Sequence, residues 1–122
     1  MTSYFFDSYA IIELIRGNEN YDFVKEEIIT TSAMNLAEVY YALLLDQNKE
    51  VAKKIINSLN VELIEITSEI AIESSLFRYE NKKHKFSYID CIGYLLAKNN
   101  NLIFLTGDMQ FENLINVKFV KK

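Results

Sequence analysis

The sequence contains no proline, only three glycines and a single cysteine. It also lacks low-complexity tracts and internal repeats, so nothing indicates a linker between two folding units. At 122 residues the chain is long enough for one hydrophobic core and too short for two, and we expect one domain over residues 1–122. Cys91 can form no internal disulfide, which is typical of cytoplasmic proteins, and we expect that location here.

Long apolar segments are absent too. The longest uninterrupted apolar run covers residues 39–45 and is far shorter than the roughly 20 residues that a membrane-spanning helix requires. No basic stretch precedes an apolar one at the N-terminus, so we expect neither a targeting peptide nor contact with a membrane. Half of the residues are apolar and a quarter are charged, a balance typical of a soluble globular protein.

Short apolar, β-branched or aromatic runs alternate along the chain with segments of helical periodicity. The expected strands cover residues 4–6, 28–31, 61–66, 102–105 and 117–120, and the expected helices cover residues 8–16, 21–27, 33–46, 49–59, 67–80, 87–99 and, as a brief turn, 110–114. This alternation predicts an α/β fold, a three-layer α/β/α sandwich with a central parallel sheet.

Two aspartates follow expected buried strands. The apolar run at 102–105 stops abruptly at Thr106, Gly107 and Asp108, and the run at 4–6 stops at Asp7. Ligands bind outside the carboxyl edge of open parallel sheets, so both carboxylates are placed for chemistry. Each of them, taken alone, could equally be a helix cap or a turn residue.

Two further carboxylates, Glu38 and Asp90, lie in helices that are otherwise largely apolar. Glu38 is neither a cap nor on an evidently solvated face, whereas Asp90 has the spacing of a capping box that starts at Ser87. We expect Gly93, three residues further on, to leave the face of Asp90 open to close approach. Buried carboxylates are costly unless a cation compensates them, so four converging ones would require a hard metal ion such as Mg²⁺ or Mn²⁺.

Four short motifs then follow one another along nearly the whole chain: FFDS at 5–8, NLAEV at 35–39, SYIDCI at 87–92, and LTGD at 105–108 with Phe111 after it. Together they resemble the PIN domain family (PilT N-terminal type), and within it the small VapC-type toxins. The resemblance implies a compact α/β/α sandwich with a carboxylate pocket that binds Mg²⁺ or Mn²⁺. It also implies a metal-dependent endoribonuclease, the toxin of a type II toxin–antitoxin pair that a cognate antitoxin restrains.

The resemblance further implies roles for the acids in the hydrolysis of an RNA phosphodiester bond by in-line attack. Asp7 and Asp90 would be the main metal ligands. Glu38 and Asp108 would complete the coordination directly or through water. These four are the candidate catalytic and metal-binding residues.

The segment after the fourth expected strand carries two supporting positions and one departure from the family. Thr106 could orient Asp108 or a water molecule, or be an ordinary strand-end residue, and Gly107 would let the backbone turn and approach a ligand. The family often has a further aspartate where this chain has Gln110. Glu112 could substitute for it, although a residue of a helical turn is more often solvated, so the number of metal ions stays open.

The formal net charge of −4 argues at first sight against a nucleic-acid substrate. Setting the four candidate acids aside leaves 13 acids, however, which balance the 13 lysines and arginines. RNA contacts are expected from the basic cluster Lys82, Lys83 and Lys85, although a solvated loop explains that cluster equally well. Arg16 is a weaker candidate, and His84 is expected to be a loop residue and not a catalytic base.

The helix expected at 33–46 is apolar on more sides than contact with one sheet requires. The residues concerned are Tyr40, Tyr41, Leu43, Leu44 and Leu45, together with the region 21–23. We expect them to form an exposed apolar surface that supports a homodimer and offers a groove to an antitoxin segment. An ordinary core helix is the alternative.

Two other classes of function were weighed. A catalytically weak or inactive PIN-fold interaction module would keep the fold without the activity, and Gln110 is the only sequence feature that favours it. A receiver-type phosphotransfer domain also has aspartates at strand ends, but it needs paired acids beside the first strand and a lysine after the last full strand. Asp7 has no acidic neighbour and no lysine closely follows Asp108, which disfavours a receiver domain.

Overall fold

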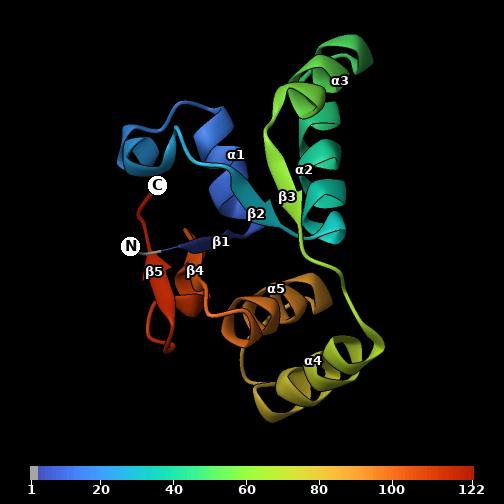
Figure 1. Ribbon diagram of the computed structural model, residues 1–122, viewed down its shortest axis with the longest axis vertical. Helices are drawn as coiled ribbons and strands as arrows, with labels where there is room; N and C mark the ends of the chain where they lie inside the picture. Colours follow the sequence, from blue (N-terminus) through green and yellow to red (C-terminus); the bar gives the residue numbers. More distant parts are fainter. Residues whose placement is uncertain (1–2) are drawn as a thin grey trace.

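The computed structural model describes residues 3–122, in which parallel strands alternate with helices (Figure 1). The elements are β1 (Tyr4–Phe6), α1 (Ser8–Ile15), the 3₁₀ helix η1 (Glu19–Val24), β2 (Ile29–Thr31), α2 (Ala33–Asp46), α3 (Lys49–Ser58), β3 (Val61–Leu63), α4 (Ser68–Glu80), α5 (Tyr88–Asn99), β4 (Ile103–Thr106), the 3₁₀ helix η2 (Met109–Phe111) and β5 (Val117–Phe119). No helix in this part of the chain is both long enough and apolar enough to span a bilayer.

Each of the five α-helices begins at a polar side chain that accepts a hydrogen bond from a backbone N–H three residues further on. The capping residues are Asp7, Ser32, Asn48, Thr67 and Ser87. A cap of this kind stabilises a helix by about 1 kcal/mol, because it satisfies a donor that the first turn leaves free. The helix starts are therefore encoded locally, in a chain that has no proline to mark them.

The strands form two hydrogen-bonded sheets, β1-β4-β5 and β2-β3, and each of their three ladders is parallel. β1 and β2 lie side by side, and the Thr31 hydroxyl donates a hydrogen bond of 2.7 Å to the Phe6 carbonyl between them. Taken across this junction, the strand order is β3-β2-β1-β4-β5. A side chain thus bridges the sheet where the backbone ladder is interrupted.

Neighbouring residues of the central strands face opposite layers, as the pleat of a strand requires. Phe5 pairs in register with Phe104, and both belong to the core that includes α4 and α5. Phe6 pairs with Leu105, and both belong to the core that includes α1, α2 and α3. The predicted three-layer α/β/α architecture with a parallel sheet is confirmed.

Differences from the predicted elements are confined to edges and short segments. The strand expected at 28–31 begins at Ile29 because Ile28 is exposed, and the strand expected at 61–66 ends at Leu63. Ile64 still donates one backbone hydrogen bond to Thr31, at 2.8 Å. The helix expected at 21–27 is instead η1, which starts earlier and is wound as a 3₁₀ helix.

Candidate active site

The strand order creates a switch point between β1 and β4. The chain moves outward from β1 to β2 and β3, and then returns through α4 and α5 to β4 on the other side of β1 (Figure 1). In open α/β sheets the crevice outside such a point is the usual ligand site. Asp7 directly follows β1 and Asp108 lies two residues beyond β4, so both occupy this position.

Asp7 is nearly inaccessible to solvent, with 4% of its surface exposed. Its Oδ1 accepts a hydrogen bond of 2.8 Å from the backbone N–H of Ala10, and its Oδ2 accepts one of 2.5 Å from the Thr106 hydroxyl. Burial raises the pKa of the Asp7 carboxyl from 3.8 to about 7, even though both hydrogen bonds lower it, and the charges of Asp90 and Asp108 raise it further. Asp7 is therefore a carboxylate that only a cation would keep fully ionised at neutral pH.

Thr106 joins the ends of the two central strands. Its hydroxyl donates to Asp7 and accepts a hydrogen bond of 3.0 Å from the backbone N–H of Asp108. Thr106 could orient Asp108 or a water molecule, or be an ordinary strand-end residue; its hydroxyl contacts the Asp108 backbone, and its proton is directed to Asp7. The residue is buried, and its side chain fixes one oxygen of the neighbouring carboxylate.

Glu38 reaches the site from the middle of α2. Its Oε1 accepts a hydrogen bond of 2.5 Å from the Ser8 hydroxyl, which in turn accepts one of 3.0 Å from the Asn35 side-chain amide. Burial raises the pKa of the Glu38 carboxyl, the Ser8 hydrogen bond lowers it, and the charge of Asp90 raises it. Glu38 thus has a fixed orientation although it caps no helix.

Asp90 serves as a capping residue and also faces the other acids. Its Oδ2 accepts a hydrogen bond of 2.9 Å from the Ser87 N–H, while its own N–H donates to the Ser87 hydroxyl at 3.0 Å, which confirms the predicted capping box. Burial raises the pKa of the Asp90 carboxyl, the bond from the Ser87 backbone lowers it, and the charge of Asp108 raises it. The structural and the functional interpretations of this residue are therefore compatible.

Asp108 caps η2 and is connected to the basic loop through Gln110. Its Oδ1 accepts a hydrogen bond of 3.0 Å from the Gln110 N–H, and the Gln110 side-chain amide lies 3.4 Å from its Oδ2. The Gln110 carbonyl oxygen accepts a bond of 2.6 Å from the backbone N–H of Lys85. The residue at which the chain departs from the family pattern therefore links the acids to the loop at 81–87.

Two glycines pack closely against aromatic side chains. A Cβ on Gly93 would lie 3.0 Å from Phe5 and 3.2 Å from Phe104, so this glycine lets α5 pack against the sheet and does not open a face of Asp90. A Cβ on Gly107 would overlap the ring of Tyr9 and lie 2.8 Å from the Tyr21 hydroxyl. Gly107 therefore leaves room for the Tyr9 and Tyr21 side chains, and its expected approach to a ligand stays a prediction.

The four acids Asp7, Glu38, Asp90 and Asp108 interact electrostatically with one another. Within residues 3–122 the ion pairs involve only Arg16, so no lysine or arginine neutralises any of the four. An all-oxygen donor set of this kind suits Mg²⁺ or Mn²⁺. However, no three acidic, histidine or cysteine side chains in the described residues are close enough to form a ready metal cage. The donor chemistry fits a divalent ion such as Mg²⁺, which usually binds through one or two carboxylates and keeps several water molecules.

The predicted RNA-contacting residues fall into two different environments. Lys82, Lys83 and Lys85 are exposed in the loop between α4 and α5. Arg16 lies at the other end of α1 from the site, where it pairs with Asp46 at 3.0 Å and with the buried Glu13 at 3.6 Å. The charge of Arg16 is therefore already compensated, whereas the lysines of the loop have no acidic partner in the described residues.

Sequence reasoning assigned no role to Ser8 or Asn35, although both lie in the motifs quoted above. The sequence offered one signal, an amide in a largely apolar helix three residues before Glu38, and the structure shows this Asn35 to be buried. Ser32 donates a hydrogen bond of 2.6 Å to the side-chain oxygen Oδ1 of Asn35 and so extends the network that orients Glu38.

Comparison with solved structures shows the same fold in bacterial toxins. VapC20 of Mycobacterium tuberculosis, a Sarcin-Ricin loop cleaving toxin, has a TM-score of 0.75 at 15% identity, covering 95% of this chain and 99% of that chain. VapBC2 of Rickettsia felis, bound to promoter DNA, has a TM-score of 0.73 at 17% identity, covering 98% of this chain and 100% of that chain. A toxin–antitoxin complex from Klebsiella pneumoniae has a TM-score of 0.72 at 21% identity, covering 95% of this chain and 96% of that chain. At these identities the likeness shows the fold.

Comparison at the level of sequence gives the family. No curated protein sequence matches the chain significantly. A family model described as "PIN domain" matches residues 4–116, which is nearly the whole chain and includes all four acids of the site. The predicted resemblance is thus confirmed: the chain belongs to the PIN domain family.

Proposed function

We propose that this protein is a metal-dependent endoribonuclease and the toxin of a type II toxin–antitoxin pair. The observation that carries the proposal is the group of four uncompensated carboxylates at the switch point of the sheet. Membership of a family of nucleases supports it, as does the fold shared with a Sarcin-Ricin loop cleaving toxin and with toxin–antitoxin complexes. An RNA substrate of this kind implies a location in the cytoplasm.

Asp7 and Asp90 would hold a Mg²⁺ or Mn²⁺ ion, with Glu38 and Asp108 completing the coordination directly or through water. When bound, such an ion lowers the pKa of water and neutralises charge that develops on a phosphate during in-line hydrolysis. Donation from Thr106 keeps the Asp7 Oδ2 in one direction. The Ser8 hydroxyl does the same for the Glu38 Oε1. These neutral donors orient the carboxylates without cancelling the charge that attracts a cation.

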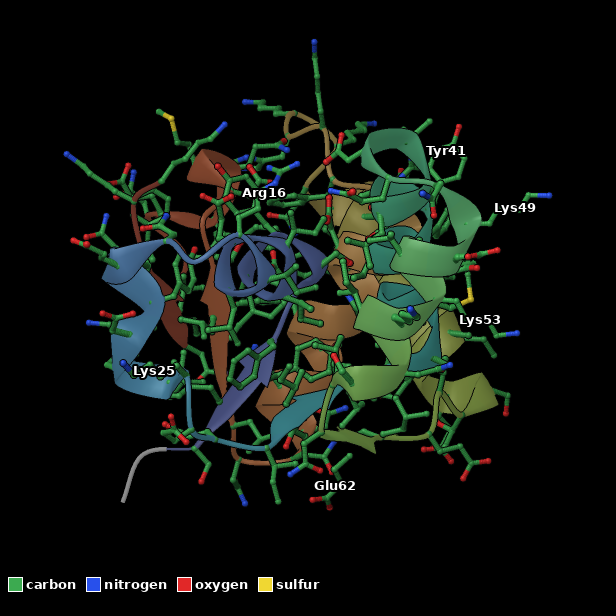
Figure 2. The ribbon with its side chains drawn as sticks, turned by 90° about the horizontal axis from the view of Figure 1, so that it is seen from above. Arg16, Lys25, Tyr41, Lys49, Lys53 and Glu62 are labelled. Carbon is green, nitrogen blue, oxygen red and sulfur yellow. The ribbon has the colours of Figure 1, made fainter. Side chains whose placement is uncertain are left out.

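The partners we propose are a cognate antitoxin and a second copy of the chain. Met34, Tyr41 and Leu45 are 44%, 65% and 70% exposed, and their spacing places them on one side of α2. Figure 2 shows Tyr41 on the outer side of the molecule. By contrast, Tyr21 and Leu43 belong to the core, so the apolar surface is narrower than the sequence suggested. Leu45→Lys is expected to lower the dimer fraction measured by sedimentation velocity, whereas Lys53→Ala on the next helix is not.

Cleavage of a mixed RNA pool tests the enzymatic part of the proposal. The antitoxin-free parent is expected to cleave with added Mg²⁺ or Mn²⁺ and to stop when the ion is chelated, and Asp7→Asn and Asp90→Asn are expected to abolish cleavage. Glu62→Gln is the matched control, because Glu62 is an exposed acid on β3, which β2 separates from β1 and the site. Undiminished cleavage by both aspartate variants would refute the assignment. An inactive parent would instead favour the non-catalytic PIN-fold interaction module.

A further inference from the structure

A pocket of about 730 Å³ opens between the C-terminal half of α4, the loop that follows it and the first turn of α5. Its volume falls in the range of roughly 300–1,000 Å³ that is usual for ligand sites. The lining residues are Ser75, Arg78, Tyr79, Lys82, His84, Lys85, Phe86, Ser87 and Tyr88. Arginine and lysine contribute three of these residues and none is acidic, although the chain as a whole is acidic.

Cations and aromatic rings are paired inside this pocket. The Arg78 guanidinium carbon lies 4.5 Å from the centre of the Tyr88 ring, and the Lys82 ammonium lies 4.9 Å from the centre of the Tyr79 ring. Tyr88 and Tyr79 are 53% and 68% exposed, so both rings offer stacking surface next to a positive charge. Proteins bind single-stranded nucleic acid with this combination, because the base stacks on an aromatic ring and the phosphate pairs with a cation.

The pocket is also physically joined to the acid site. Ser87 lines the pocket and holds Asp90 through the capping box. On the other side, Gln110 accepts from the backbone of Lys85 and contacts Asp108. A chain of hydrogen bonds therefore connects the pocket wall with two of the four carboxylates.

The Arg78 side chain is fixed as well, because its Nε donates a hydrogen bond of 2.9 Å to the Phe86 carbonyl. The His84 ring stacks on the ring of Phe86 at 4.7 Å with an angle of 9° between their planes. These contacts preform the wall from which the cations project. A ligand would find the charged and aromatic groups already in place.

We infer that this pocket binds one nucleotide of a single-stranded RNA beside the phosphate that is to be cleaved, with its base on Tyr79, the more exposed of the two rings, and its phosphate on the adjacent Lys82. The inference rests on the proposed function and adds to it how the substrate is held. An acidic protein segment would use the cations but not the exposed rings, so the aromatic pairs favour RNA. Stacking without base-edge contacts makes the pocket tolerant of sequence, and a paired base cannot enter it.

Binding is measured by fluorescence anisotropy of a labelled, mixed-sequence single-stranded RNA, with EDTA present so that the RNA stays intact. Tyr79→Ala is expected to weaken binding by about 5-fold to 100-fold, the loss of one stacked base, while Tyr79→Phe keeps the ring and the affinity. Lys82→Ala is expected to weaken binding. It should also reduce the slope of log K against the logarithm of the salt concentration by about 0.7, the value for one phosphate contact on a single strand. Lys53→Ala is the matched control, since Figure 2 shows Lys53 projecting outward from α3, which lies far from α4 in Figure 1.

Parent-like binding by both Tyr79→Ala and Lys82→Ala would overturn the inference, even if the protein cleaves RNA. A loss of binding that accompanies a change in oligomeric state would also overturn it. So would polyglutamate that displaces the RNA and whose own binding Tyr79→Ala weakens as much as it weakens RNA binding. Cleavage of the same RNA with Mn²⁺ is measured separately. If the variants lose binding while the parent cleaves nothing, the pocket is supported and the proposed nuclease activity fails.

Discussion

Replacing Asp7 by asparagine is expected to stabilise the metal-free protein at neutral and alkaline pH. Asp7 is 4% exposed, and burial raises its pKa to about 7 from 3.8 in the unfolded chain. Between these two values the folded state keeps a proton that the unfolded state has lost, so the free energy of unfolding falls as pH rises. For this one group, the loss between about pH 5 and about pH 8 is about 2.5 kcal/mol.

Asparagine removes this dependence because it carries no charge. Its carbonyl oxygen can still accept from the Ala10 N–H, while its amide replaces the oxygen to which Thr106 donates, at a cost of about 1 kcal/mol. At about pH 8 the parent bears nearly the full cost of ionising the buried Asp7, about 4 kcal/mol for a pKa raised from 3.8 to about 7, so the variant is expected to be more stable by about 3 kcal/mol, although it should be inactive.

Urea denaturation in EDTA at the two pH values measures this difference. Asp22→Asn serves as the control, because Asp22 is an exposed aspartate and the substitution should leave the pH dependence unchanged. If parent and Asp7→Asn lose the same free energy of unfolding between the two pH values, Asp7 is not a desolvated carboxylate and the electrostatic account of the site is refuted.

Three further outcomes follow from the contacts at the site. Thr106→Val removes the donor to Asp7 and the acceptor for the Asp108 N–H, and should lower the free energy of unfolding by about 1–3 kcal/mol. Thr106→Ser keeps the hydroxyl and should not lower it. Equal urea midpoints for the parent and Thr106→Val would contradict this role. Gly107→Ala should cost about 1–3 kcal/mol in the same assay, because its methyl group would overlap the Tyr9 ring. Mn²⁺ at about 100 times its dissociation constant should raise the free energy of unfolding of the parent by about 2.7 kcal/mol, and an unchanged melting temperature would count against a metal site.

The parts of the fold that sequence could predict are those encoded over a few residues. Thr67 and Ser87 mark helix starts because their side chains bond to N–H groups three residues away, and those starts are where they were expected. Asp7 and Asp108 could be placed at one edge of the sheet because each follows an apolar strand, and parallel strands end on the same side. The local residue pattern and the parallel topology together were enough to predict these helix starts and the positions of the two aspartates.

Contacts between residues far apart in sequence were not predictable in the same way. The hydrogen bond from Thr106 to Asp7 joins residues 99 positions apart, so the register of β1 against β4 had to be known first. The expectation for Gly93 was wrong for a related reason, since the rings of Phe5 and Phe104 fill the space beside it. Gln110 looked like a lost ligand, and only the folded loop shows its bond to Lys85.

Direct binding of Mn²⁺, followed by the electron paramagnetic resonance of the free ion, tests the central claim that the four carboxylates form a cation site. The parent should bind Mn²⁺ saturably, and Glu62→Gln, which changes an exposed acid on β3, should bind it equally well. Asp90→Asn keeps an acceptor for the Ser87 N–H but removes one of the proposed main ligands, and should lose the binding. A parent that binds no Mn²⁺, or an Asp90→Asn variant that binds it as tightly as the parent, would contradict the account.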